Sequence, residues 1–107
     1  MKPDMVKIVV FTPESHTDIV CDAMGEAGAG HIGNYSHCFF LTKGHGRFTP
    51  GLGTNPYVGE VGKREEAVEI KIETVCPREK LQVVIEAVKE VHPYEEIAFD
   101  VYPLEQV

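Results

Sequence analysis

The order of the apolar segments most constrains what this chain can fold into. Four segments have the composition or the two-residue alternation of strands, and two repeat their apolar residues at helical spacing. In chain order, these six segments are residues 6–11, 19–27, 35–42, 68–72, 81–91 and 97–101. The order strand, helix, strand, strand, helix, strand predicts an α+β domain of ferredoxin-like topology. We therefore expect one antiparallel sheet with both helices packed on the same face.

Local signals set the ends of the two helices. Thr12 is a suitable N-cap with Pro13 as the first helical residue, and Gly28 provides the left-handed conformation in which many helices end. The second helix opens at Pro77 and must stop near His92, because a proline follows and disfavours helical geometry in the residue before it. The faces expected to be buried consist of Ile19, Val20, Ala23, Met24 and Ala27, and of Leu81, Val84, Ile85, Val88 and Val91.

The composition bounds the location and the partners of the chain. Its 107 residues, 43% of them hydrophobic, are expected to form a single domain, residues 1–107. Seventeen acidic residues against ten basic ones give a formal net charge of -7, which repels nucleic-acid phosphates and anionic lipid. The longest apolar run near the start, residues 8–11, is too short for a signal peptide or a membrane span. We expect a soluble, cytoplasmic protein with reduced cysteines and with no nucleic-acid or membrane partner.

The stretch AGAGHIGNYS, residues 27–36, contains the G-x-G-x-x-G spacing of a dinucleotide-binding fingerprint. That fingerprint works where a strand leads into a helix, because the helix N-terminus then faces the pyrophosphate. Here the glycines follow a helix and lead into a strand, so the nearest helix end is the negative one. We interpret the glycines as turn residues rather than a nucleotide site. The side chains that remain available to contact another ligand are His31, Asn34 and Tyr35.

Residues 43–66, KGHGRFTPGLGTNPYVGEVGKREE, are expected to form one long loop between the second and third strands. The segment contains six glycines and two prolines. A loop of this length in a small domain is usually functional or engaged by a partner.

Three motifs, GAGHIGNYSHCFF, GHGRFTPGLGTNPYVG and HPYEEIAFDVYPLE, occur in this order along the chain. Through them the chain, from about Val6 to Glu105, resembles the domain inserted in the Nif-three-like proteins, also called dimetal-binding or GTP-cyclohydrolase type-two-like. The resemblance implies a stand-alone relative of that domain with a fold similar to CutA and the PII signalling proteins. Such relatives are commonly trimeric and bind small ligands or metal ions at subunit clefts.

The resemblance does not extend to hydrolase activity, because the dimetal site of full-length relatives is built from segments that flank the insert. The pairs Ser15–His16 and Ser36–His37 provide candidates for nucleophilic catalysis, but neighbours in sequence say nothing about hydrogen-bond geometry and no triad is evident. We therefore expect a protein that is not an enzyme.

The segment HPYEE, residues 92–96, is expected to be a rigid connector between the second helix and the last strand. In one interpretation Tyr94 packs against the domain and the carboxylate of Glu95 faces solvent. In the other, both side chains form the polar edge of a cleft. Arg47 is either an ordinary surface residue or a clamp for a carboxylate or phosphate. The predicted ligand-binding residues are accordingly His31, Asn34, Tyr35, Arg47, Tyr94 and Glu95.

Histidine and cysteine side chains suggest a divalent transition metal as the one cofactor to consider, because imidazole and thiolate suit zinc, copper or nickel. The candidate ligands are His31, His45 and Cys38. The two histidines are predicted to lie in turns before and after the second strand, where an antiparallel return of the chain would bring them together. Cys38 has a histidine neighbour, but adjacent residues of a strand point to opposite faces.

Three functional hypotheses follow and remain open at this point. The first is a non-enzymatic small-ligand-binding or regulatory module, whose cleft is bordered by the glycine-rich loop and the HPYEE segment. The second is a histidine-based divalent-metal-binding protein. The third is a purely structural oligomerisation domain.

The uncovered face of the predicted sheet indicates self-association. If Ile8, Phe39 and Phe99 pack under the helices, then Val9, Phe11, Cys38, Phe40, Ala98 and Tyr102 lie on the opposite face, or the reverse. Either way both faces of three strands are apolar, and soluble monomers rarely expose such a face. The charged residues Glu69, Lys71 and Glu73 would then need pairing or a place at the rim. We expect a homo-oligomer, a trimer by resemblance and a dimer as the alternative.

Overall fold

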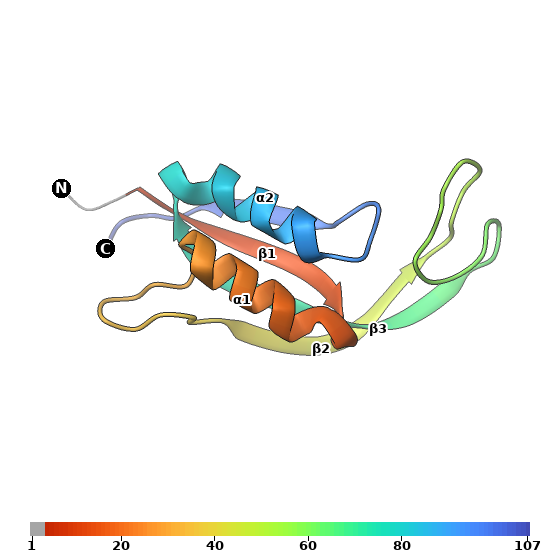
Figure 1. The fold of residues 1–107 in the computed structure, drawn as a ribbon, viewed down its shortest axis with the longest axis horizontal. Coiled ribbons are helices and arrows are strands. Elements are labelled where there is room, and N and C mark those ends of the chain that lie inside the picture. Colours follow the sequence, from red (N-terminus) through yellow and green to blue (C-terminus); the bar gives the residue numbers. More distant parts are fainter. Residues whose placement is uncertain (1–3) are drawn as a thin grey trace.

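The fold is one antiparallel sheet covered on a single face by two helices, as the sequence predicted (Figure 1). The computed structural model describes residues 4–107. Its elements in chain order are β1 (Met5–Pro13), the 3₁₀ turn η1 (Glu14–His16), α1 (Thr17–Ala27), β2 (Phe40–Phe48), β3 (Glu65–Pro77), the 3₁₀ turn η2 (Arg78–Lys80), α2 (Leu81–Val91) and β4 (Phe99–Pro103). The strands pair in the order β2-β3-β1-β4. Within residues 4–107, no helix is long and apolar enough to cross a membrane.

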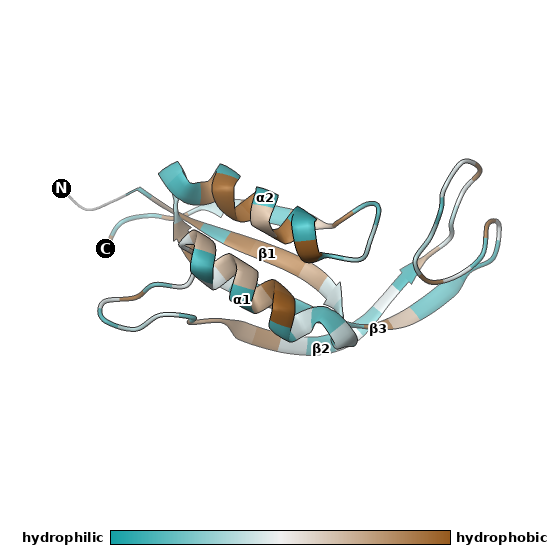
Figure 2. Ribbon diagram, in the orientation of Figure 1, coloured by the Kyte–Doolittle hydropathy of each residue, from teal (hydrophilic) through white to brown (hydrophobic). Residues whose placement is uncertain are grey.

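The core lies between the helices and the middle of the sheet. Alternate residues of β1 and β3 point toward the helices, and Ile8, Val10 and Ile72 are fully buried there. The helices contribute Val20, Met24, Val84 and Val88, all fully buried. Figure 2 shows hydrophobic residues along β1 and on both helices. Burying each such side chain stabilises the fold by about 1.5–3 kcal/mol.

The C-terminal ends of both helices agree with the sequence, whereas their starts do not. Gly28 ends α1 in the left-handed conformation, with φ 116°, and its amide donates to Gly25 O. Helix α2 ends at Val91, as predicted, but it begins at Leu81 rather than at Pro77, because Pro77 still pairs with Met5 in the sheet and η2 comes before the helix. The predicted start of α1 at Pro13 is wrong, because Pro13 still pairs with Glu69 in the sheet and η1 comes before the helix. The rotation of α1 also leaves Ile19 half exposed rather than buried.

The second strand and the loop after it differ from the prediction. Strand β2 covers residues 40–48 rather than 35–42, so the predicted loop of residues 43–66 shrinks to residues 49–64. The reason is pairing: β3 is 13 residues long, and its first half holds the polar and glycine-rich end of β2 in register, up to Phe48 opposite Glu65. Hydrophobic pattern alone cannot reveal a strand held by its partner.

Beyond the end of β1, strands β2 and β3 continue as a two-stranded ribbon. Strand β1 ends where Pro13 pairs with Glu69, so residues 45–48 and 65–68 pair only with each other. We call this ribbon with its loop, residues 45–68, the arm. The arm extends the molecule to 51 × 23 × 21 Å, and Figure 1 shows it reaching away from the helices.

The sheet face opposite the helices is mixed rather than uniformly apolar. Of the two assignments that the sequence left open, the structure has Ile8, Phe39 and Phe99 on the helix side. Phe40 and Tyr102 lie on the other face with 68% and 51% of their surface exposed. Charged residues share that face: Lys7 Nζ lies 2.7 Å from Glu73 Oε1, and Lys71 Nζ lies 3.8 Å from the same atom. The central charges of this face are therefore paired within the chain.

Candidate functional site

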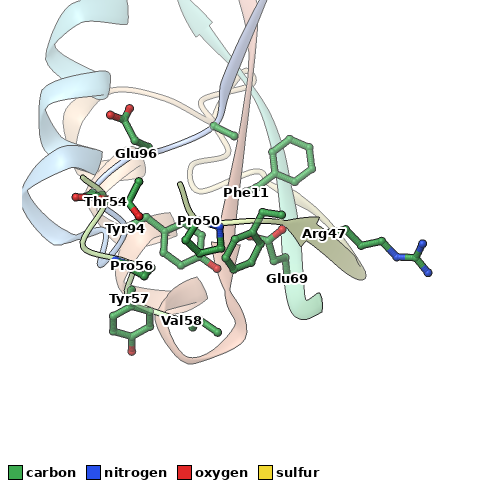
Figure 3. A pocket seen from close by; sticks show the side chains of 13 residues that line it. Phe11, Arg47, Pro50, Thr54, Pro56, Tyr57, Val58, Glu69, Tyr94 and Glu96 are labelled. Atoms are coloured by element: carbon green, nitrogen blue, oxygen red, sulfur yellow. The ribbon is translucent and has the colours of Figure 1, made fainter. Parts of the chain in front are cut away.

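A pocket of about 310 Å³ lies between the arm and the connector that joins α2 to β4 (Figure 3). Strand β1 ends beside it, so the sheet is narrow at this point and leaves room for side chains from both segments. Most of the lining is apolar or aromatic, with three carboxylates and one guanidinium among the lining residues. These are Phe11, Arg47, Phe48, Pro50, Thr54, Pro56, Tyr57, Val58, Glu69, Tyr94, Glu95, Glu96 and Ala98.

The connector is held by His92, which is 92% buried. His92 Nδ1 accepts a hydrogen bond from the amide of Tyr94 at 3.1 Å. The proton of the neutral ring is therefore on Nε2, which donates to Phe11 O at 2.8 Å. Burial lowers the pKa of His92, although the bond to Phe11 O opposes this shift. The histidine thus ties the connector to the end of β1 in its neutral form.

The loop of the arm closes against the connector through one hydrogen bond and an aromatic contact. The amide of Asn55 donates to Glu95 Oε1 at 2.8 Å, across 40 residues of sequence. The ring of Tyr57 lies 6.0 Å from that of Tyr94 and 6.0 Å from that of His16. With Phe11 of β1, the arm and the connector thus bring three distant parts of the chain to the pocket lining.

Glu69 and Tyr94 supply the polar groups in the middle of the lining. Burial raises the pKa of Tyr94, and the neighbouring carboxylate of Glu69 raises it further. The same carboxylate packs on the backbone of Gly46, where a methyl group would collide with it. A side chain of any size at residue 46 would thus displace Glu69.

Of the predicted ligand-binding residues, the structure brings Arg47, Tyr94 and Glu95 to the pocket lining. The guanidinium of Arg47 nevertheless turns away, and its Nε donates to Glu66 Oε2 at 3.1 Å (Figure 3). The cause is strand register: Arg47 pairs with Glu66, whereas Phe48 lies on the opposite face of the ribbon. The expected clamp for a carboxylate or phosphate is therefore not formed.

The other three predicted residues, His31, Asn34 and Tyr35, lie at the opposite end of the sheet. Their turn is attached at Gly30, whose amide donates to Val75 O at 2.8 Å. Val75 pairs with Lys7, whereas the pocket lies where Glu69 pairs with Pro13. Six residues of strand separate the two places, roughly 20 Å. The ligand-binding residues predicted from the sequence thus belong to two separate regions.

The predicted metal ligands are not brought together within one chain. His45 lies in β2 rather than in a turn, because that strand is longer than expected, and its Nδ1 is 3.9 Å from Glu66 Oε1. Cys38 precedes β2, and His31 Nε2 lies 3.3 Å from Gly25 O at the end of α1. No cluster of three or more histidine, cysteine or acidic side chains suited to a metal occurs among residues 4–107.

Both serine–histidine pairs are within hydrogen-bond distance. Ser15 Oγ lies 2.8 Å from His16 Nδ1, and Ser36 Oγ lies 3.1 Å from His37 Nδ1. In the part of the chain described, no carboxylate hydrogen-bonds either imidazole, so neither pair has the third group that would orient it as a base.

Sequence reasoning missed Phe48, Tyr57 and Glu69 as lining residues. Tyr57 had a usable signal, since it is an aromatic residue in a glycine-rich loop. No sequence signal marked Glu69, because it occupies a polar position of an alternating strand, where a side chain is expected to face solvent.

Comparison with known proteins identifies relatives of nearly the whole chain, although no family model matches it. The GTP cyclohydrolase 1 type 2 homolog of Halalkalibacterium halodurans is 52% identical over 100 residues, which are 94% of this chain and 27% of that protein. The crystal structure of a Bacillus cereus protein related to NIF3 superposes with a TM-score of 0.85 at 47% identity, over 97% of this chain and 26% of the other. The chain thus spans about a quarter of the length of these relatives.

More distant structures share the fold. The periplasmic divalent cation tolerance protein CutA of Archaeoglobus fulgidus has a TM-score of 0.69 at 19% identity, over 96% of this chain and 86% of that one. GlnK of Bacillus subtilis has a TM-score of 0.62 at 20% identity, over 94% of this chain and 85% of that one. The chain therefore belongs to the NIF3-related family of GTP cyclohydrolase 1 type 2 homologs, of which it represents one region, with the fold of CutA and GlnK.

Proposed function

We propose that this region is a non-enzymatic binding module that holds a small organic ligand in the pocket between the arm and the connector. The observation that supports the proposal is that three segments distant in sequence, β1, the arm and the connector, line one pocket. Its volume of about 310 Å³ and its apolar lining with few polar groups are typical of small-molecule sites.

The position of the pocket gives binding a regulatory consequence. One wall belongs to the arm and the other to the connector, and the hydrogen bond between Asn55 and Glu95 and the contact between the Tyr57 and Tyr94 rings link them. A ligand that contacts both walls would favour the closed arrangement over an open one, because it binds only that arrangement well. The module would thereby convert ligand concentration into the position of the arm.

A thermal-shift screen of small organic molecules and divalent metals, with two matched tyrosine variants, tests the proposal. A ligand that binds only the folded state raises the melting temperature. We expect organic ligands to stabilise the wild type and Tyr35→Ala but not Tyr57→Ala, since both tyrosines are exposed on loops and only Tyr57 lines the pocket. Stabilisation by metals alone would favour the histidine-based alternative. Equal stabilisation of all three proteins, or of none by any compound, would contradict the proposal.

We also propose that the chain forms a homo-oligomer through the sheet face opposite the helices. Phe40 and Tyr102 are exposed there, and Lys7 with Lys71 neutralises Glu73 and lowers its pKa, so the face can be covered without burying an unpaired charge at that position. A trimer is expected by resemblance to CutA and PII.

Light scattering after size exclusion should give three times the monomer mass, or twice that mass for a dimer. Phe40→Glu should reduce the measured mass to that of the monomer. A wild-type protein with the mass of a monomer would refute the proposed homo-oligomer.

A further inference from the structure

The lining of the pocket carries an uncompensated negative charge. Glu69 contributes a carboxylate that packs on Gly46 and lies near enough to Tyr94 to raise the pKa of its hydroxyl. Among residues 4–107, no lysine, arginine or histidine lies within 4.0 Å of it, whereas Glu73 on the same strand pairs with two lysines. The one guanidinium of the lining, that of Arg47, pairs with Glu66 on the other face.

The other two carboxylates of the lining leave Glu69 as the charged group that a ligand meets. Glu95 already accepts the amide of Asn55. The carboxylate of Glu96 points away from the group formed by Tyr94 and Glu69 (Figure 3). Both nevertheless add to the negative potential of the pocket, as does the net charge of -7.

Aromatic rings surround this charge. Tyr57 and Tyr94 lie with ring centroids 6.0 Å apart and planes inclined by 52°, and Phe11 and Phe48 belong to the same lining. The face of an aromatic ring attracts a cation, most strongly where water is excluded. A carboxylate beside several rings is the arrangement that recognises an organic cation.

We propose, on the basis of the binding function proposed above, that the ligand of this pocket is a small organic cation with an apolar body. Its ammonium group lies between Glu69 and the two tyrosine rings. Its hydrocarbon or aromatic body packs on Phe11, Phe48 and Val58. This assignment reverses the expectation from the sequence, where Arg47 suggested a carboxylate or phosphate.

Three probes of similar shape and different charge test the assignment: 2-phenylethylammonium, 2-phenylethanol and 3-phenylpropionate. Isothermal titration calorimetry at pH 7.5 should show that the cation binds at least about tenfold more tightly than the neutral alcohol, which is about 1.4 kcal/mol. The anion should bind more weakly than either. Tighter or equal binding of the alcohol or the anion overturns the assignment while the pocket remains a binding site.

Two carboxylate variants separate the effect of Glu69 from that of overall charge. Glu69→Gln and Glu66→Gln each remove one negative charge from β3, but only Glu69 lines the middle of the pocket unpaired. Glu69→Gln should abolish the preference for the cation, and Glu66→Gln should keep it. Loss of the preference in both variants, or in neither, overturns the assignment.

A glycine pair provides a second test that leaves every charge in place. A methyl group at residue 46 would collide with the carboxylate of Glu69, whereas a methyl group at residue 44, on the same face of β2, meets no atom within 4 Å. Gly46→Ala should weaken binding of the cation several-fold, and Gly44→Ala should not. If none of the three probes binds but other compounds bind in the pocket, the assignment of an organic cation is rejected. If no compound binds in the pocket at all, the proposed binding function is rejected.

Discussion

The two ends of the sheet are both rich in glycine, and both were predicted from the sequence to contact a ligand. Each lines a hollow, but the two hollows differ in charge: Glu69 at the arm end has no basic partner among residues 4–107, whereas Glu73 beside the turn is paired with two lysines. Hydrogen bonds hold the backbone of the turn of residues 28–39: the amide of Cys38 donates to Gly30 O at 2.9 Å within the turn, and Thr74 Oγ1 of β3 donates to Cys38 O at 2.7 Å. The side chains of residues 31–37, including Tyr35 with 75% of its surface exposed, point into solvent.

The arm end is fastened differently. Its loop, residues 49–64, meets the connector through Asn55 and Glu95 and through the rings of Tyr57 and Tyr94. At the turn end the backbone itself is bonded to β3, whereas at the arm end the side chains of Glu95, Tyr57 and Tyr94 make the contacts. Glycine content therefore indicates where the chain turns, and the side chains that line each hollow decide what it can bind.

Glycine substitutions should break the two ends unequally. Gly30 and Gly53 both have positive φ, 77° and 86°, so alanine is strained at either position. A methyl group at residue 30 would also crowd the backbone of Cys38, at 3.0 Å from its nitrogen, while one at residue 53 meets nothing within 4 Å. We expect Gly30→Ala to lower the free energy of unfolding by about 2–4 kcal/mol and Gly53→Ala by about 1–2 kcal/mol. Urea denaturation measures both, and equal losses would contradict the comparison.

Removing the histidine of the connector should loosen the arm end alone. His92→Ala deletes the hydrogen bonds to Phe11 O and from the amide of Tyr94, so we expect a loss of about 1–3 kcal/mol in the free energy of unfolding. His45→Ala is the control, because His45 is exposed on β2, and it should cost less than about 0.5 kcal/mol. An equal effect of the two variants would show that the connector is not held by His92.

Acidification should reveal the same histidine. The pKa of His92 in the folded state is below its ordinary value of 6.5, so the unfolded state binds the proton more readily. The stability that neutral His92 contributes is therefore fully present above pH 6.5, and it is lost as the pH decreases from 6.5 toward the pKa of His92 in the folded state. The free energy of unfolding between pH 7.5 and 5.5 should decline in the wild type and decline less in His92→Gln. Parallel pH profiles would exclude this role.

The smallest expected effect concerns the bond between the arm and the connector. Glu95→Gln replaces a charged acceptor of the Asn55 amide with a neutral one at an exposed site, so global stability should change by less than about 1 kcal/mol. Hydrogen exchange of the Asn55 amide should nevertheless accelerate several-fold. The amide of Gly62, which donates to Pro50 O at 2.7 Å within the loop, should exchange as before. Unchanged exchange at Asn55 would mean that Glu95 does not hold the loop.

The sequence predicted the parts of the fold that depend on local periodicity. The buried face of α2, the alternation of β3 and the end of α1 at Gly28 follow from residues close to one another in the chain. It failed at β2, where Gly44, Gly46 and the polar residues between them are kept in a strand by pairing with β3. Tyr94 and Glu95 were placed near a cleft from their motif, whereas Glu69 could not be, because its role depends on which segment lies across from it.

The central claim is that the arm end, and not the turn of residues 28–39, is the ligand site. The most direct measurement is a ¹H–¹⁵N correlation spectrum of the labelled wild-type protein titrated with the compounds that stabilise it. The amides that shift should lie in residues 54–58 and 94–98, with those of residues 30–38 unchanged. Shifts confined to residues 30–38, or none at either end at saturating ligand, would contradict the account.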